Sequence, residues 1–355
     1  MIYPYSKAYE PYVLHQESLE NMEISSLVSP KGSGLVGRRV CYEGKVREII
    51  SNYTEALTQC DIIWFVNDEK FKISEEAIKR KVIEAVRAGK KIIFTRTDTV
   101  NKENIVNIIP LQQKIQLERS HRMEDKLKAE YCYHIDTPVL IVYGTEAGTD
   151  KLAVQLSLRR EFIHRGYKVA SISSRVDSEL YGMYAMPEFM IGHGCSEAEK
   201  IKRFNHYVKQ IELAEHPDIM IVGVPGGTLP FDRIDHNEYG ILAYEISFAV
   251  PCDGAVMCMT YNLDFEGDFS DFTHDMELVF RYKTICSHVA AAVPDMKKMS
   301  ENRKRHLVSL DREFIDAKIK QYDKQNVFNI LNKDGAERAV DLICDALSDE
   351  DEVIK

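Results

Sequence analysis

The sequence lacks close cysteine pairs, long uncharged apolar runs and an excess of positive charge. Its eight cysteines stand singly. Zinc ribbons, iron–sulfur sites and redox dithiols need close pairs, so we expect reduced thiols and no metal site. Nowhere do about 18 apolar residues follow one another, and the N-terminus lacks a charged segment leading into an apolar one. We therefore expect a cytoplasmic protein that makes no membrane contact.

The formal net charge of −10 disfavours a nucleic acid as partner, because binding a phosphate backbone needs clustered cationic side chains. Hydrophobic residues make up 45% of the chain and charged residues 29%, as in an ordinary globular protein. The 355 residues exceed the roughly 250–300 at which a single hydrophobic core stops growing. Two domains are therefore expected.

The first part of the chain alternates apolar strands with a helix. A serine N-cap at Ser74 and a glycine C-cap at Gly89 bound that helix. The order strand, helix, strand predicts a parallel sheet with a crossover, and we assign residues 1–110 to a Rossmann-like α/β domain. The predicted elements are the strands Glu23–Ser29, Asp61–Asp68 and Lys90–Asp98 and the helix Ile73–Gly89.

A charged stretch without glycine or proline predicts a connecting helix over residues 111–135, after which a second alternating series begins. Its continuous apolar strands are typical of a doubly wound sheet buried on both faces. We assign residues 136–346 to a P-loop NTPase-like α/β domain and residues 347–355 to a mobile acidic tail. The predicted strands are Val139–Gly144, Tyr167–Arg175, Asp218–Gly227 and Gly254–Asn262, and the predicted helices are Lys151–Arg165, Ser196–Glu215 and Tyr239–Ala249.

The turn after Val139–Gly144 resembles a phosphate-binding loop with two departures. The usual loop is G-x-x-x-x-G-K-[ST], in which backbone N–H groups and the lysine hold phosphates and the hydroxyl reaches magnesium. Here Asp150 occupies the last glycine position and Leu152 the hydroxyl position, which should lower phosphate affinity and remove a magnesium ligand. Thr145, Thr149 or Asp150 would have to supply the missing oxygen. The predicted anion or nucleotide site, with ATP and magnesium as candidate ligands, is Gly144, Thr145, Gly148, Thr149, Asp150 and Lys151.

Further candidates follow other strands of the second domain, at the carboxyl edge where ligands of open α/β sheets bind. Arg175 and Asp177 follow one strand and form either a ligand contact or a structural ion pair. A second group follows the strand Asp218–Gly227, where this enzyme class usually carries an acidic magnesium ligand, or forms a solvated loop. That group is Gly226, Gly227, Asp232, Asp235, His236 and Glu238.

Two other patterns carry less weight. Gly32–Gly37 matches G-x-G-x-x-G after a strand, but the residues that follow predict a strand or loop, whereas a dinucleotide site needs a helix there. Cys252 and Cys258 flank an apolar strand and are expected to be core or turn residues. A catalytic cysteine would need a base such as His236 or His193 beside it.

Several segments resemble a family of clostridial peptide maturation system proteins. Their genes accompany Cys-rich precursor peptides and radical-SAM maturases, so the resemblance implies a precursor peptide and a maturase as partners. A more distant likeness is to proteins with a Rossmann-like N-terminal half and a dethiobiotin-synthetase-like C-terminal half. The segments of the first resemblance are Ser29–Gly37, Tyr143–Arg175, Met186–Gly192, Val222–Asp232 and Tyr239–Val250.

Three functions remain open from the sequence. The first is an accessory protein of peptide maturation that binds a precursor, a maturase or a nucleotide through a degenerate phosphate loop. The second is an ATP-dependent ligase or kinase acting on a small acid or peptide carboxylate. Asp150 and Leu152 favour the first, because they remove parts of the machinery that the second needs. The third is a scaffold without a ligand.

Overall fold

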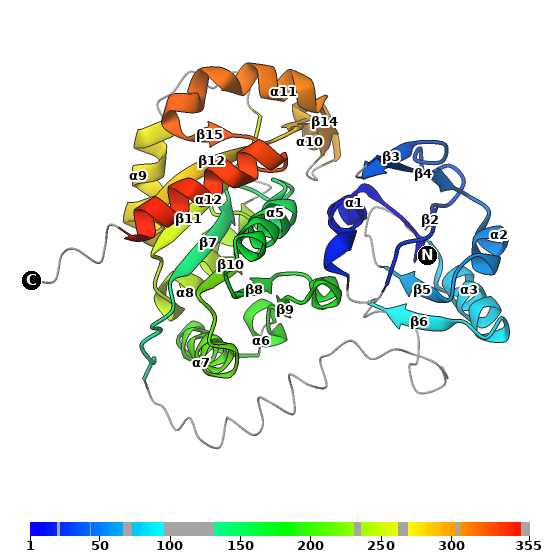
Figure 1. Ribbon diagram of the computed structural model, residues 1–355, viewed down its shortest axis with the longest axis horizontal. Coiled ribbons are helices and arrows are strands. Elements are labelled where there is room, and N and C mark those ends of the chain that lie inside the picture. Colours follow the sequence, from blue (N-terminus) through cyan, green and yellow to red (C-terminus); the bar gives the residue numbers. More distant parts are fainter. Residues whose placement is uncertain are drawn as a thin grey trace, which may run out of the picture. The chain divides into compact units, whose positions relative to one another are not determined.

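The computed structural model describes residues 1–19, 22–42, 44–66, 73–95, 131–192, 194–230, 236–261, 269–302 and 306–348. The chain divides into two compact units (Figure 1). Unit 1 comprises Met1–Arg119 together with Val176–Gly182, and unit 2 comprises Ser120–Arg175 together with Met183–Lys355. The sequence analysis assigned residues 136–346 to one domain, whereas the structure groups the short segment Val176–Gly182 with unit 1.

Unit 1 contains a six-stranded sheet of order β3-β4-β2-β1-β5-β6. All neighbours pair in parallel except β3 and β4, which form an antiparallel hairpin. Counted along the chain, the parallel strands have the order 3-2-1-4-5, as in a Rossmann fold. The strands are β1 (Ile2–Tyr3), β2 (Leu27–Val28), β3 (Arg39–Tyr42), β4 (Lys45–Ile50), β5 (Ile62–Phe65) and β6 (Lys91–Phe94).

The two faces of this sheet are covered differently. Helices α2 (Tyr53–Thr58) and α3 (Glu75–Arg87) pack on one face, against a core that includes Phe65 and Ile92. Ser74 caps α3 by accepting a hydrogen bond from Ala77 N, and Gly89, at φ +68°, follows its last turn, as the sequence predicts. On the other face, the short α1 (Glu10–Leu14) brings Tyr12 against Trp64.

The segment Val176–Gly182 completes that second face. It contains a 3₁₀ helix, Val176–Tyr181, whose Tyr181 ring lies 4.8 Å from the Tyr12 ring. The Tyr181 hydroxyl donates to Tyr12 O at 2.6 Å, and the Tyr12 and Ser178 hydroxyls share a hydrogen bond of 3.0 Å. These contacts are buried and fasten the segment to unit 1.

Unit 2 is built on a parallel seven-stranded sheet of order β15-β12-β11-β7-β10-β8-β9. The central β7 is buried along its whole length, which explains its uninterrupted apolar sequence. A separate pair, β13 (Ala292–Pro294) and β14 (Leu307–Ser309), is antiparallel. The strands of the main sheet are β7 (Val139–Gly144), β8 (Val169–Ser173), β9 (Tyr184–Ala185), β10 (Ile219–Gly223), β11 (Gly254–Thr260), β12 (Thr284–Ala290) and β15 (Val327–Phe328).

Helices cover both faces of this sheet, and alternate residues of β7 face the two layers (Figure 1). Leu140 and Val142 pack with α5 and α12, whereas Ile141 and Tyr143 pack with α7 and α8. The predicted fold class, two α/β units built on parallel sheets, is confirmed. The helices are α5 (Lys151–His164), α6 (Glu188–Ile191), α7 (Glu197–Glu215), α8 (Ile241–Ala249), α9 (Phe269–Phe280), α10 (Met296–Asn302), α11 (Arg312–Ile319) and α12 (Lys333–Ser348).

This connectivity creates a crevice at the carboxyl edge of the sheet. β7 and β10 are neighbours, but β7 leads into α5 on one face and the chain after β10 leads to α8 on the other. Adjacent parallel strands whose connections leave in opposite directions form the crevice in which open α/β sheets bind ligands. The predicted phosphate loop lies at this point.

Some predicted elements differ or fall outside the described residues. Residues 131–135 form no helix, and the rest of the predicted connecting helix lies outside the described residues, as do residues 349–355 of the predicted tail. The sequence analysis gave no element to the region that contains α9, β12 and α12. Within the described part of the chain, no helix combines the length and apolar character needed to cross a membrane.

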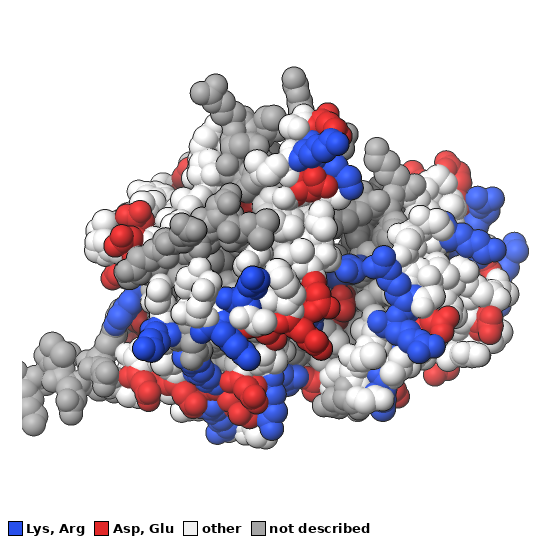
Figure 2. All heavy atoms as spheres, turned by 90° about the horizontal axis from the view of Figure 1, so that it is seen from above, with Lys and Arg blue, Asp and Glu red and all other residues white. Residues whose placement is uncertain are grey.

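Acidic and basic side chains are interspersed over the face shown in Figure 2. The basic side chains of the β3–β4 hairpin illustrate the mixing, because Arg47 and Lys45 both pair with Glu23, at 2.8 and 3.4 Å. Such exposed pairs contribute little to stability.

Candidate functional site

The loop between β7 and α5 folds back tightly on itself. The Thr149 hydroxyl donates to Glu146 O at 3.2 Å and lies where a side chain on Gly144 would begin. Gly148 has φ +84°, a left-handed conformation that favours glycine. Close packing therefore explains the glycine at position 144, and backbone conformation explains the glycine at position 148.

Asp150 occupies the last glycine position of the usual loop, and its backbone has the left-handed conformation that glycine adopts easily. Its φ is +61°, in the left-handed region that aspartate tolerates better than most residues. Asp150 is also the N-cap residue of α5, yet no described side chain caps that helix. Instead, the carboxylate is directed to His288, with Oδ2 at 3.8 Å from Nε2. The Asp150 side chain therefore turns toward β12.

His288 is a buried residue of β12, and one of its two ring nitrogens accepts a backbone hydrogen bond. Its Nδ1 accepts the backbone N–H of Ile330 at 3.2 Å. A nitrogen that accepts a hydrogen bond carries no proton, so the proton of the neutral ring lies on Nε2. That Nε2 has no hydrogen-bond partner among the described residues, and the imidazole is 1% exposed. The ring therefore presents a buried N–H donor toward the Asp150 carboxylate.

Lys151 lies at the crevice between β7 and β10. Its ammonium donates to Gly226 O in the loop after β10 and to Glu146 O at 3.4 Å. The same two loops are joined by Thr228, whose N–H and hydroxyl both donate to Gly144 O, at 3.0 and 3.1 Å. The structure thus brings Lys151 and the predicted Gly226 to one place. Two of the contacts of this ammonium are therefore to backbone carbonyl oxygens.

The charges of the loop are separated along the sheet edge. The buried Glu146 carboxylate accepts a hydrogen bond from the Thr260 hydroxyl, at the end of β11, and Asp150 faces β12. In the order β12-β11-β7-β10, both carboxylates therefore lie on one side of β7 and the Lys151 ammonium on the other. The opposite charges of the loop are thus separated along the edge of the sheet.

Two of the three side chains proposed from sequence as magnesium ligands face other groups of the protein. Thr149 donates to Glu146 O, and Asp150 faces His288. Thr145 is half-buried and is anchored by its N–H, which donates to Cys258 O at 3.0 Å. Among the described residues, no group of three or more His, Cys, Asp and Glu side chains is arranged to hold a metal ion.

The backbone at the start of helix α5 nevertheless suits an anion. The first helical hydrogen bond runs from Val154 N to Asp150 O at 3.0 Å. The N–H groups of Leu152 and Ala153 precede it and have no acceptor within the helix. Such N–H groups, with the positive end of the helix dipole, attract anions.

The loop after β10 ends in a left-handed turn. Asn237, Glu238 and Tyr239 have φ values of +47°, +50° and +55°, and Gly240 follows at +71°. Left-handed backbone costs a non-glycine residue roughly 1–2 kcal/mol, so contacts must hold this turn in place. The Asn237 amide donates to Leu229 O, and His236 Nδ1 accepts the N–H of Glu238 at 3.1 Å. Predicted residues Asp232 and Asp235 lie outside the described residues.

This turn sits directly on the crevice. A side chain on Gly227 would lie 2.6 Å from Glu146 Cα and 2.7 Å from Asn237 Cγ, so the turn, Gly227 and the phosphate loop are in contact. The ring of Tyr239 is 68% exposed and stacks on the ring of His236 at 4.7 Å. His236 and Glu238 therefore lie beside the crevice as predicted, and Tyr239, which the sequence analysis did not propose as a site residue, presents an aromatic surface there.

Arg175 and Asp177 are separated by the structure. Arg175 follows β8 in unit 2, and its N–H donates to Ser173 Oγ at 3.3 Å. Asp177 is buried in the 3₁₀ helix that belongs to unit 1. The two residues therefore belong to different units, and a ligand contact or an ion pair at this place stays a prediction.

Cys252, Cys258 and the glycine-rich loop lack the features that a thiolate nucleophile or a dinucleotide site needs. Burial raises the pKa of the Cys252 thiol to about 12 and that of Cys258 further still, so neither is a thiolate near neutral pH. His193, the other candidate base, lies outside the described residues. The hairpin β3–β4 follows Gly32–Gly37, so the helix that a dinucleotide site needs is absent there, as predicted.

Sequence reasoning missed Glu146, Thr260, His288 and Tyr239. Glu146 stands in the quoted loop, but nothing in the sequence shows that it turns inward to Thr260. His288 lies on β12, which reaches the loop only through its pairing with β11. The helix predicted near Tyr239–Ala249 is present as α8 (Ile241–Ala249), and the left-handed turn that presents Tyr239 precedes it.

No protein-family model matches the sequence, and no curated protein matches it in sequence. Among solved structures, the chain is similar to a DUF1611 family protein from Anabaena variabilis, with a TM-score of 0.59 and 10% identity over 94% of this chain and 95% of the other. That likeness shows the α/β fold.

Two other solved structures are less similar. One is the signal recognition particle receptor FtsY from Elizabethkingia anophelis, with a TM-score of 0.28 and 16% identity over 61% of this chain and 66% of the other. The second is MurF ligase from Thermotoga maritima in complex with ADP, with a TM-score of 0.22 and 14% identity over 68% and 45%. These low scores carry no argument about function.

Proposed function

We propose that unit 2 binds the phosphate groups of a nucleotide in the crevice between β7 and β10. The observation that carries the proposal is the position of the Lys151 ammonium, which bridges the loops after these strands through Gly226 O and Glu146 O. Phosphate oxygens would replace these carbonyls and would also meet the N–H groups at the start of α5. Both loop carboxylates face the opposite side of β7, which limits their repulsion of the ligand.

The exposed ring of Tyr239 favours a nucleotide over inorganic phosphate. A nucleobase can stack on an aromatic face, and one face of Tyr239 already stacks on His236. The turn that carries this ring touches Gly227, next to the carbonyl that holds Lys151. The base and phosphates of one ligand would then contact neighbouring parts of the same crevice.

We propose that unit 2 binds the nucleotide without hydrolysing it efficiently. Leu152 offers no oxygen to magnesium, and the Thr149 and Asp150 oxygens are directed to Glu146 O and His288. In keeping with the resemblance to peptide maturation proteins, we propose that the bound form assists the processing of a Cys-rich precursor peptide, with a radical-SAM maturase as partner. That resemblance in sequence is the support for the peptide role.

Thermal unfolding with and without nucleotide tests the binding proposal. A ligand that binds only the folded protein stabilises it by about 2.7 kcal/mol at 100 times its Kd. We expect ATP and ADP to raise the melting temperature, and pyrophosphate to raise it less because it lacks a base. Lys151→Ala should abolish the shift. Lys333→Ala is the matched control, because Lys333 is the first residue of α12 as Lys151 is of α5.

The outcomes separate the remaining functions. No shift with any nucleotide, or a shift that survives in Lys151→Ala, would refute nucleotide binding at this loop. Steady release of inorganic phosphate from MgATP in the presence of a peptide carboxylate would show the ligase or kinase instead. Retention of a Cys-rich precursor peptide on the immobilised full-length chain tests the peptide role, and failure of an equimolar scrambled peptide to be retained is the control.

A further inference from the structure

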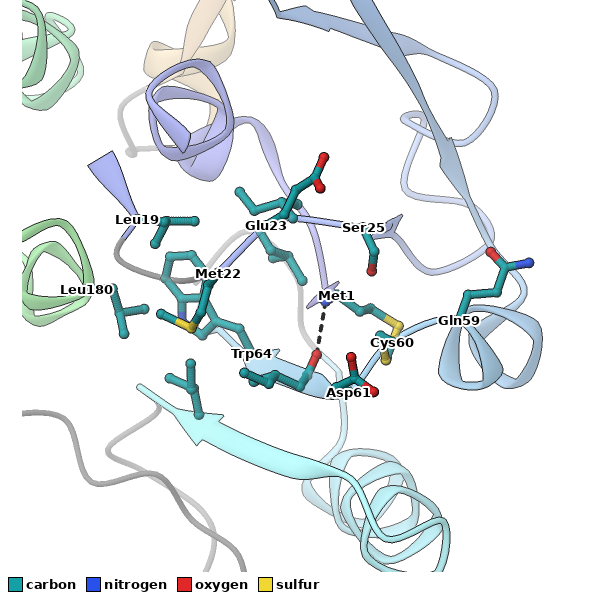
Figure 3. A pocket seen from close by; sticks show the side chains of 14 residues that line it. Met1, Leu19, Met22, Glu23, Ser25, Gln59, Cys60, Asp61, Trp64 and Leu180 are labelled. Atoms are coloured by element: carbon teal, nitrogen blue, oxygen red, sulfur yellow. Dashed lines mark hydrogen bonds between the residues drawn. The ribbon is translucent and has the colours of Figure 1, made fainter. Parts of the chain in front are cut away.

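A pocket of about 320 Å³ lies within unit 1 (Figure 3). It arises because the two faces of the unit 1 sheet are covered unequally. A parallel sheet is normally covered on both faces, and α2 and α3 cover one of them. The other carries shorter elements, namely the five-residue α1, the 3₁₀ turns Lys7–Tyr9 and Gln16–Ser18 on either side of it, and the segment Val176–Gly182. A hollow remains near the amino ends of β1, β2 and β5.

One end of the pocket is apolar. Leu19, Met22, Trp64 and Leu180 gather there, and Leu180 is contributed by the segment Val176–Gly182 (Figure 3). Trp64 is 5% exposed, and its indole N–H donates to the Thr95 hydroxyl at 3.3 Å. The volume is at the lower end of the roughly 300–1,000 Å³ typical of small-molecule pockets. It suits a ligand with an aromatic ring or a short branched chain.

The other end is polar and acidic. Ser25, Cys60 and Asp61 lie there, close to the Met1 amine, which donates to Ile62 O at 3.0 Å (Figure 3). Glu23 also lines the pocket but is paired with Arg47 at 2.8 Å. Burial lowers the pKa of the Met1 amine, which weakens the positive charge of that group. The exposed Asp61 carboxylate therefore supplies the charge that a ligand would meet.

We propose that this pocket binds a small organic amine, with its apolar body against Trp64 and Leu180 and its ammonium group at Asp61. The apolar body loses contact with water, while the ammonium group stays near solvent beside a carboxylate. This arrangement avoids the cost of burying an unpaired charge. It also excludes carboxylates of the same size, which Asp61 repels.

The test uses three compounds of similar size that differ in charge. Trp64 is the only tryptophan in the sequence, so its fluorescence reports on the pocket directly. We expect phenethylamine to alter the Trp64 emission and to bind roughly fivefold more tightly than phenethyl alcohol, with hydrocinnamate weakest, as one exposed charge pair allows. Thermal unfolding with the same compounds gives a second measurement that does not depend on fluorescence.

Two variants with matched controls assign the effect to the pocket. Asp61→Asn should reduce the preference for the amine to within about twofold of the alcohol, whereas Glu76→Gln, an exposed acid of α3, should leave it unchanged. Leu180→Phe narrows the apolar end and should weaken all three compounds. Ile83→Phe, at an exposed position of α3, should not.

The proposal is overturned if no compound alters either signal, or if the three bind equally well. It is overturned equally if hydrocinnamate binds most tightly, or if the amine preference survives in Asp61→Asn. Because Asp61 is exposed, that variant is expected to fold, so the charge test remains valid even if Leu180→Phe does not fold.

Discussion

The carboxylate of Asp150 lies 3.8 Å from Nε2 of His288, and this pair explains how an acidic residue fits into a phosphate-type loop. Asp150 meets the backbone requirement of its position by adopting φ +61°, and its charge is directed to a buried imidazole N–H on β12. The crevice between β7 and β10 is left to Lys151. The loop therefore departs from the usual pattern in sequence while keeping the left-handed backbone that glycine would adopt at this position.

Replacing Asp150 tests both parts of that explanation. Asp150→Gly removes a side chain from a left-handed position and should raise the free energy of unfolding by about 0.5–1 kcal/mol. It also removes a negative charge from the loop, so ATP should bind roughly fivefold more tightly. Denaturant unfolding and isothermal titration calorimetry measure the two effects.

Asp150→Asn is the control that separates charge from backbone strain. Asparagine tolerates left-handed backbone as aspartate does, so the affinity should rise without a gain in stability. Equal or weaker ATP binding in both variants would show that the Asp150 carboxylate does not oppose the ligand.

His288 is expected to matter for stability through its hydrogen bond with Ile330. His288→Phe leaves the buried Ile330 N–H without its acceptor and should lower the free energy of unfolding by about 1–3 kcal/mol. His288→Asn places an oxygen near the position of Nδ1 and should cost less. Urea unfolding of both variants provides the measurement, and an equal loss in the two would contradict the role assigned to this hydrogen bond.

Gly226 and Gly227 form a matched pair for testing the crevice. A side chain on Gly226 meets open space, so Gly226→Ala should cost only the left-handed strain at φ +67°, about 1 kcal/mol. Gly227→Ala would push against Glu146 Cα and Asn237 Cγ, which are 2.6 and 2.7 Å from the new carbon. We expect it to displace the loop and to weaken ATP binding more than Gly226→Ala does. The opposite ranking in calorimetry would argue against the described packing.

Glu245 of α8 should make stability depend on pH. Burial raises the pKa of this carboxyl to about 7, although Lys200 of α7, 3.4 Å away, opposes the shift and Glu197 adds to it. Between the ordinary value of 4.5 and 7, the folded state keeps a proton that the unfolded state has released. Stability should therefore fall as the pH rises through this range, by up to about 1.4 kcal/mol per unit, and level off above it.

Glu245→Gln removes the titrating group and should flatten that dependence. Urea unfolding from about pH 5 to pH 8 compares the variant with the natural chain. The control is Glu199→Gln, which replaces an exposed acid of α7 and should keep the slope. A slope of the same size in Glu245→Gln would assign the pH dependence to other groups.

The loop was predictable from sequence because its determinants are local. An apolar strand, a glycine turn and a lysine lie within a few residues, and the structure places Gly144 and Lys151 at a strand end and a helix start as expected. The partners of this loop were not predictable. His288 and Thr260 reach it only because β11 and β12 take particular places in the sheet, and one sequence does not state that order.

The turn before α8 shows how tertiary contacts override local preference. Glu238 and Tyr239 favour right-handed or extended backbone, so the sequence predicted a helix from Tyr239. Contacts at both ends of the turn stabilise the left-handed backbone instead. The Asn237 amide donates a hydrogen bond to Leu229 O, and Gly240 packs against Thr228 O. The helix begins only at Ile241.

The return of residues 176–182 to unit 1 has a consequence for how the protein is made. During synthesis the first hundred residues leave the ribosome well before Leu180 and Tyr181, which complete one face of their sheet. Unit 1 therefore cannot finish folding as a nascent N-terminal segment, although N-terminal domains usually fold first. A truncated chain that ends before residue 176 would leave Tyr12 without this cover and should be prone to aggregate.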